Sequence, residues 1–267
     1  FGSEWQLWTN AFLTFAEHGL RLEDLHVTAR QAALGVIGAS VSNEGFDQIR
    51  GAMRLNAELG SFLGQYLDTL TEYCYWFTIF GTPSSSEPWG WQLQGHHVVV
   101  NCLIIQRQVV LTPSFLGAEF ESDLLFNEHR SAALEFHSSL SRAQRAEAVL
   151  HPSMTGLPAA LAGPVDGRHR AAAGQDNLVL PYEGLRADTL SSGQLALLHQ
   201  LLRPYMGLLP DGSREARTAQ VERFIDQSWF AWIGGAGQAD AFYYKIHSPV
   251  VLVEYDNHPG VFLDNDE

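Results

Sequence analysis

The stretch HHVVVNCLIIQRQVVLT, residues 96–112, gives the clearest indication of the fold. Two runs of β-branched and other apolar residues flank a short polar QRQ segment, which is the pattern of a β-hairpin. Because side chains alternate across a strand, we expect His96 on one face and His97 on the other, together with Asn101. The hairpin therefore places at least one histidine in or near an apolar core.

Apolar spacing predicts further elements on both sides of this hairpin. The expected helices cover residues 5–16, 46–63 (with Ser42-Asn43 as caps), 124–140, a short helix capped by Ser141, 189–202 and 214–228. The expected strands cover residues 73–80, 89–93, 229–233, 243–247, 250–255 and 261–263, and residues 151–181 are loop-rich. No repeat of fixed period is visible. This order predicts an α+β fold, a mainly antiparallel sheet with helices packed around it.

We expect a single α+β domain over residues 1–267, with a helical part over 1–70 and the motif-bearing part over 70–267. The hairpin 96–112 and the strands within 243–263 are expected in the same sheet, because both carry histidines on strand-like segments. The sequence stops just beyond a predicted strand, so we expect its C-terminal end to be truncated.

Composition excludes several classes of function. The chain has 16 Lys and Arg against 30 Asp and Glu, a net charge of −14, so neither nucleic acid nor an anionic membrane surface is an expected partner. No apolar run is long enough to span a bilayer, and no targeting segment is visible, so we expect a cytoplasmic protein. Cys74 and Cys102 lie in apolar surroundings as buried thiols or, alternatively, as one disulfide.

Histidines and carboxylates near the C-terminus form a second candidate group. His247 ends an aromatic strand, and Glu254, Asp256 and His258 alternate along the next one. Nitrogen and oxygen ligands in this arrangement suit a divalent metal. The alternative is a solvated edge strand followed by an ordinary Asp-Asn-His-Pro-Gly turn.

Common catalytic motifs are missing from the sequence. The glycines of residues 234–237 do not open a helix after a parallel strand, so they do not predict a dinucleotide site. There is no P-loop, no HExxH and no GxSxG. A reaction type therefore has no support from a local motif.

Nine segments together resemble the domain-of-unknown-function 3500 family of bacteria and fungi. They are FGTP (80–83), EPWGW (87–91), GHH (95–97) with Asn101, TPSFLGAE (112–119), QDN (175–177), PYEG (181–184), FAWIG (230–234), YYKIHSP (243–249) and VEYDNHPGV (253–261). The resemblance implies no particular reaction. It does imply that relatives continue with a His-Ile-His segment, a common metal-ligand arrangement that this sequence lacks.

Our leading hypothesis is a metal-dependent enzyme, hydrolytic or oxidative, that acts on a small-molecule substrate. The metal is zinc, iron or copper, and its candidate ligands are His96, His97, His247, Glu254 and His258. Glu254 is also the candidate general base, and Glu119 is a spare candidate acid. The candidate substrate-binding residues are Trp89, Trp91, Asp176, Tyr182, Glu183, Tyr243 and Tyr244.

One geometric expectation and one competing hypothesis complete the interpretation. We expect His97, His247 and Glu254 to converge on one ion, and the polar loop over 164–184 to cover the nearby cleft. The alternative is a non-catalytic ligand-binding or scaffold protein in which the histidines are structural. The sequence leaves the oligomeric state open.

Overall fold

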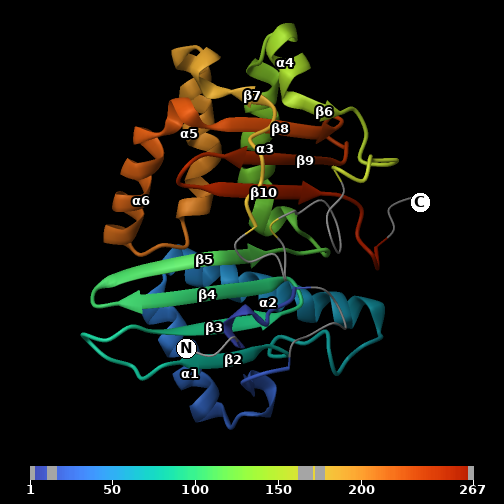
Figure 1. Cartoon of the computed structure of the whole chain (residues 1–267). Helices are drawn as coiled ribbons and strands as arrows, with labels where there is room; N and C mark the ends of the chain where they lie inside the picture. Colours follow the sequence, from blue (N-terminus) through green and yellow to red (C-terminus); the bar gives the residue numbers. More distant parts are fainter. Residues whose placement is uncertain (1–3, 11–16, 162–170, 172–177, 264–267) are drawn as a thin grey trace. The chain divides into compact units, whose positions relative to one another are not determined.

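The computed structural model describes residues 4–10, 17–161, 171 and 178–263 (Figure 1). The chain divides into two compact units, each with its own sheet. Unit 1 comprises residues 1–125 and 207–214, and unit 2 comprises residues 126–206 and 215–267. No helix in the described ranges is long and apolar enough to cross a membrane.

Unit 1 contains a five-stranded antiparallel sheet whose strands follow one another in chain order. The strands are β1 (Leu20–Arg21), β2 (Trp76–Phe80), β3 (Trp89–Gly95), β4 (Val98–Ile105) and β5 (Gln108–Leu116). The helices are α1 (Val27–Ser40) and α2 (Asn43–Leu63), with 3₁₀ turns at Glu4–Gln6 and Leu22–Asp24. One face of this sheet packs against α1 and α2 to form the core of the unit.

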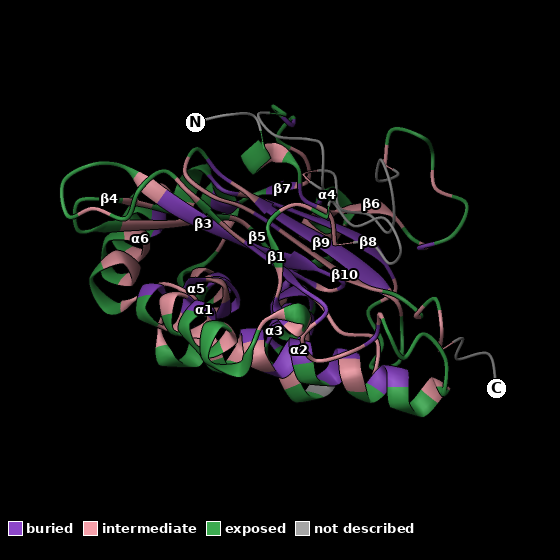
Figure 2. Cartoon of the chain, turned by 90° about the horizontal axis from the view of Figure 1, so that it is seen from below, coloured by how far each residue is buried: buried purple, intermediate pink, exposed green. Residues whose placement is uncertain are grey.

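Helix α2 begins and ends where its sequence provides caps. Ser42 accepts a hydrogen bond from the Gly45 amide at 2.8 Å, and Gly64 ends the helix with a left-handed φ of 62°. Between them, Ile49 and Met53 lie one turn apart and are fully buried, so the helix shows a buried stripe beside exposed residues (Figure 2). This confirms the helix predicted over 46–63.

Unit 2 contains the second sheet, in the order β10-β9-β8-β6, with β7 also paired to β8. Its strands are β6 (Val149–His151), β7 (Leu185–Arg186), β8 (Trp229–Gly234), β9 (Phe242–His247) and β10 (Leu252–Asn257). The remaining helices are α3 (Asp123–Ser139), α4 (Arg142–Ala148), α5 (Ser192–Met206) and α6 (Asp211–Arg223), with 3₁₀ turns at Ala187–Thr189 and Ile225–Gln227. All pairings are antiparallel except β6 with β8.

One face of the second sheet carries a layer of stacked aromatic side chains. Trp232 stacks with Phe242 and Tyr244, with ring centroids 4.5 and 6.3 Å away. Phe136 of α3 meets the edge of Phe230 at 4.8 Å, and leucines of α5 complete the core. Alternation along β9 therefore turns its other residues toward the opposite face, which we call the outer face of unit 2.

The two units repeat one arrangement of strands and helices. In each, a glycine with positive φ (Gly19, +92°; Gly184, +89°) precedes a two-residue strand, a 3₁₀ turn and a helix. A side chain at either glycine would collide with the neighbouring strand, because an added Cβ would lie 2.6 Å or less from a backbone oxygen there. The same local geometry is thus required twice.

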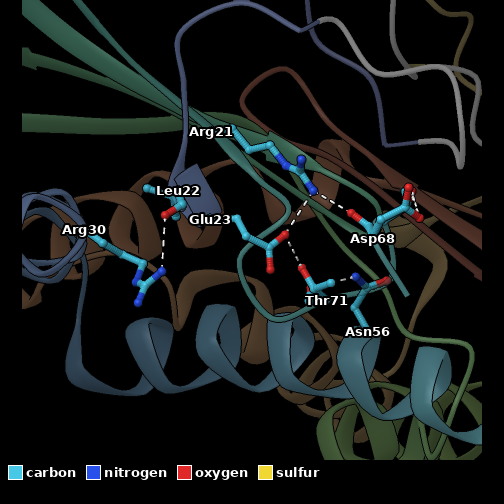
Figure 3. A network of polar contacts seen from close by, with 8 residues as sticks. Arg21, Leu22, Glu23, Arg30, Asn56, Asp68 and Thr71 are labelled. Atoms are coloured by element: carbon cyan, nitrogen blue, oxygen red, sulfur yellow. Dashed lines mark hydrogen bonds and ion pairs between the residues drawn. The ribbon is translucent and has the colours of Figure 1, made fainter. Parts of the chain in front are cut away.

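Charge pairs and strand register extend this repeat. Arg21 pairs with Glu23 at 2.9 Å within the network of Figure 3, and Arg186 pairs with Asp188 at 3.2 Å. The strand register is equivalent in the two sheets. For the first pair of strands, Arg21↔Trp76 matches Arg186↔Trp229. For the next two pairs, Thr78↔Gln92 matches Ala231↔Lys245, Trp76↔Gln94 matches Trp229↔His247, and Gln92↔Asn101 matches Lys245↔Glu254. The two units therefore share a backbone arrangement that shows no repeat of fixed period in the sequence.

The α+β fold class is confirmed, while four local expectations are wrong. The hairpin 96–112 and the strands β9 and β10 lie in different sheets. His96 and His97 lie in the turn between β3 and β4, and residues 261–263 form no strand. Residues 7–10 form no helix, while residues 11–16 of that expected helix lie outside the described residues. Whether residues 1–267 fold as one domain stays a prediction.

Candidate functional site

The outer face of unit 2 gathers five of the residues that the sequence suggested. Tyr243 and His247 alternate on β9 with the core residues, and Lys245 lies between them. Glu254 of β10 is the direct cross-strand neighbour of Lys245. Tyr182 and Glu183 reach the same face from the segment before β7.

Lys245 is the centre of this group. Its side chain is almost completely buried, at 1% exposure, and its ammonium bonds the carboxylate of Glu183 and the carbonyl oxygen of Pro181. An ammonium removed from water costs several kcal/mol unless a partner compensates it. The pair with Glu183 provides that compensation and ties residues 181–183 to the sheet.

Glu254 is held from two sides. The Tyr243 hydroxyl donates to its Oε1 at 2.7 Å, and the backbone amide of Ala171 donates to its Oε2 at 2.9 Å. Two neutral donors on the two oxygens fix the plane of the carboxylate. The contact with Ala171 also brings part of the predicted 164–184 loop onto this face, while residues 162–170 and 172–177 lie outside the described residues.

His247 has an incomplete set of partners. The Tyr182 ring lies 4.5 Å from the imidazole, and Nδ1 is buried with no hydrogen-bond partner among the described residues. Burial lowers the pKa of His247 below its ordinary value, and Lys245 lowers it further, against the opposing effects of a Pro181 backbone bond and of Glu254 and Glu183. The imidazole is therefore neutral at pH 7, with a lone pair for a proton or a metal.

The equivalent face of unit 1 is built from amides. Gln92 donates to Asn101 at 2.6 Å, and Gln94 bonds the His18 ring at 3.0 Å. Both glutamines are buried, like Lys245. Gln92, Gln94 and Asn101 occupy the register positions of Lys245, His247 and Glu254. The same three places hold neutral groups in one unit and ionisable groups in the other.

His96 and His97 lie in unit 1 and have partners there. His96 is buried, bonds Asn56 Oδ1 at 2.7 Å through Nδ1, and stacks on His97 at 3.7 Å. Burial, followed by the nearby His97, lowers the pKa of His96 to about 2, so it stays uncharged. His97 adopts a left-handed φ of 64° in its turn. Convergence of His97 with His247 and Glu254 stays a prediction, since these residues belong to different units.

The other aromatic candidates face the cores of their own units. Trp91 belongs to the core of unit 1, where its indole donates to Ser40 at 3.0 Å, and Trp89 packs beside that core. Tyr244 faces the core of unit 2, where its hydroxyl bonds Tyr205. It therefore does not line the outer face with its neighbour Tyr243.

Three further residues complete the list. Glu119 follows β5 in unit 1 and is half-buried. His258 is exposed in the turn after β10, with Nδ1 near the Pro259 carbonyl oxygen at 2.7 Å. Asp176 lies outside the described residues. Within the described ranges, no three His, Cys, Asp or Glu side chains approach closely enough to hold a metal ion.

Sequence reasoning missed Lys245, although it stands within a recognised motif. A lysine between two tyrosines and an isoleucine looks like a solvated residue of an edge strand. The alternation of Tyr243, Lys245 and His247 was the available signal, because it places the lysine on the same face as two candidates. Its pairing with Glu183 joins segments distant in sequence and has no local signature.

Comparison with known proteins shows a family and nothing finer. No significant match was found among curated proteins or among solved structures. A profile of the family described as "Protein of unknown function (DUF3500)" matches residues 2–266, essentially the whole sequence. This confirms the resemblance drawn from the nine segments, and the chain belongs to the DUF3500 family.

Proposed function

We propose that the protein is an enzyme acting on a small molecule at the outer face of unit 2, by hydrolytic or oxidative chemistry. His247 is the central group, and Glu254 is the carboxylate on the same face. The observation that carries the proposal is the buried Nδ1 of His247, which has no hydrogen-bond partner among the described residues. Buried polar atoms in native proteins are rarely left without one, so this nitrogen can accept a hydrogen bond from water or a substrate group, or bind an ion.

The charge state of the imidazole supports this role. Because burial and Lys245 both lower its pKa, His247 is neutral and able to accept a proton from water or from a substrate hydroxyl. Lys245, Glu254 and Glu183 all influence the imidazole electrostatically, so a charge that develops on it interacts with fixed neighbouring side chains. Glu119 lies in unit 1, and its role as a spare acid rests on sequence alone.

A divalent metal, zinc, iron or copper, is part of the proposal. His247 Nδ1 and the Glu254 carboxylate are donors of the kinds that these ions prefer, and both side chains lie on the outer face of unit 2. With two protein ligands among the described residues, further ligands come from water, substrate or residues outside that range. A bound metal polarises substrate oxygens and activates water.

The second candidate is a non-catalytic ligand-binding or scaffold protein. The Lys245–Glu183 pair and the Tyr243–Glu254 bond favour it, because both also serve to fasten segments to the sheet. Under this hypothesis an ordered water is the hydrogen-bond partner of His247 Nδ1, because buried waters commonly bond polar groups that have no other partner. The two candidates differ in metal binding and in turnover.

Metal reconstitution separates them. Protein stripped with a chelator and reloaded separately with zinc, iron and copper should retain about one equivalent of one ion, as a single site requires. His247→Gln should abolish retention, and His199→Gln on helix α5 is the matched control, because that histidine is not among the candidate ligands. Wild-type protein that retains no metal, while remaining folded by circular dichroism, contradicts the metal-dependent proposal and leaves the second candidate.

A further inference from the structure

We infer that Lys245 is a positioning residue of this site: its ion pair with Glu183 latches residues 181–183 onto the sheet and holds the Tyr182 ring against His247. This inference rests on the proposed function for its purpose, but the latch itself is a separate physical claim. Nothing in the family assignment gives a role to any of these residues.

The contacts make the latch short and direct. The Lys245 ammonium touches the segment twice, at the Glu183 carboxylate and at the Pro181 carbonyl oxygen. Tyr182 lies between those two anchors. Its ring is 4.5 Å from the His247 ring and 6.1 Å from Trp229, almost parallel to the latter. Because the residues on both sides of Tyr182 are fixed, its ring has little freedom to move away from the imidazole.

Unit 1 shows that the fold itself does not require a charge at this position. Gln92 occupies the equivalent register position there, is equally buried, and bonds Asn101 and the Trp5 carbonyl oxygen. A buried ion pair is a weak source of stability, because desolvation consumes much of its attraction. The lysine therefore needs a reason beyond folding, and the placement of Tyr182 over His247 provides one.

The consequence is an aromatic wall of defined geometry. Tyr182 remains 46% exposed although one side of its ring contacts His247. It covers the imidazole while still presenting apolar surface to an incoming molecule. A substrate with a planar or apolar group next to its reacting atom fits such a wall.

Histidine ring shifts test the latch without any metal. In protein labelled with ¹³C-histidine, the ring current of Tyr182 should displace the His247 signals, and Tyr182→Leu defines their position without that ring. Lys245→Gln should move them most of the way to the Tyr182→Leu position, and Lys245→Arg should leave them near wild type. Gln92→Ala in unit 1 is the matched control and should not move them.

Two further variants exclude trivial explanations. In the Tyr182→Leu background, Lys245→Gln should shift the His247 signals little further. A direct effect of the lysine charge on the imidazole would persist in this background, whereas an effect that acts through the Tyr182 ring would not. Lys245→Gln with Glu183→Gln removes both charges, so it should fold and still release the ring. His247 signals at the wild-type position in folded Lys245→Gln protein would overturn the latch.

Metal binding keeps this test distinct from the proposed function. If wild-type protein retains metal, Lys245→Gln should weaken retention and Lys245→Arg should restore it. Should wild-type protein bind none while the ring shifts behave as expected, the latch stands and the metal-dependent proposal fails. Unchanged retention in a variant whose ring is released contradicts the positioning role.

Discussion

The outer faces of the two units share a strand register but differ in chemistry. In unit 1 these positions hold neutral amides: Gln92 bonds Asn101 and the Trp5 carbonyl oxygen, and Gln94 bonds the His18 ring. In unit 2 the same positions hold a buried lysine, a neutral histidine and a carboxylate. Because the first unit shows that amides suffice for this architecture, the ionisable set of the second unit supports the proposed site on that face.

The inner faces differ in the size of their side chains. Ile79 in β2 and Trp232 in β8 occupy equivalent register positions, opposite Trp91 and Tyr244. Ile79 is 43% exposed, whereas Trp232 is fully buried within the aromatic layer. The repeat therefore fixes backbone geometry, and each unit fills its core separately.

The largest expected effect follows from this difference in burial. Trp232→Ala should destabilise the protein by about 3–5 kcal/mol, because it leaves a large cavity among stacked rings. Ile79→Ala, at the equivalent position, should cost less than about 1 kcal/mol. Chemical denaturation of both variants measures the two losses in unfolding free energy. Equal losses would contradict the difference between the two cores.

A smaller effect is expected from His129 of α3, which is buried in unit 2. Burial lowers its pKa to about 4, so the unfolded chain takes up a proton near pH 6.5 that the folded chain accepts only near pH 4. Stability should fall over this window by an amount on the order of 3 kcal/mol from this residue. His129→Phe keeps a ring between Phe126 and Tyr205 and removes the proton.

The measurement is unfolding free energy from pH 7 to pH 4 for both proteins. The advantage of His129→Phe over wild type should grow as the pH falls from 6.5 to 4 and stay constant below that. Curves that run parallel over the whole range would show that His129 titrates normally in the folded state.

The smallest effect compares helix caps. Ser42 caps α2 and also donates to the Gly207 carbonyl oxygen, while Ser141 forms a capping box with Gln144 at the start of α4. Replacement by alanine should cost about 1 kcal/mol at Ser141 and somewhat more at Ser42, where two bonds are lost. Thermal melts of both variants compare the two losses of stability. A larger loss for the Ser141 variant than for the Ser42 variant would contradict this prediction.

Local signals in the sequence predicted the elements better than their assembly. The α2 helix, its Ser42 cap and the hairpin around QRQ follow from spacing and turn chemistry over a few residues. The turn at His96 and His97 was missed because β-branched neighbours suggested a continuous strand. The sheet pairing was missed because register is set by distant contacts, and the repeat was hidden because its two copies share few identical residues.

The candidate site shows the same limit. His247, Glu254, Tyr243, Tyr182 and Glu183 were each suggested by motif or polarity, and the structure brings them to one face. Lys245, which joins them, was recognisable only once strand alternation and the partner segment were known.

Zinc titration by calorimetry tests the central claim that the ionisable outer face of unit 2 is the working site. The decisive variant carries Lys245→Gln, His247→Gln and Glu254→Gln, which gives unit 2 an amide face like that of unit 1; Gln92→Ala with Gln94→Ala is its counterpart. We expect wild type and the unit 1 variant to bind about one zinc per chain and the unit 2 variant to stay folded and bind none. Binding that survives in the unit 2 variant, or is lost in the unit 1 variant alone, would contradict the account.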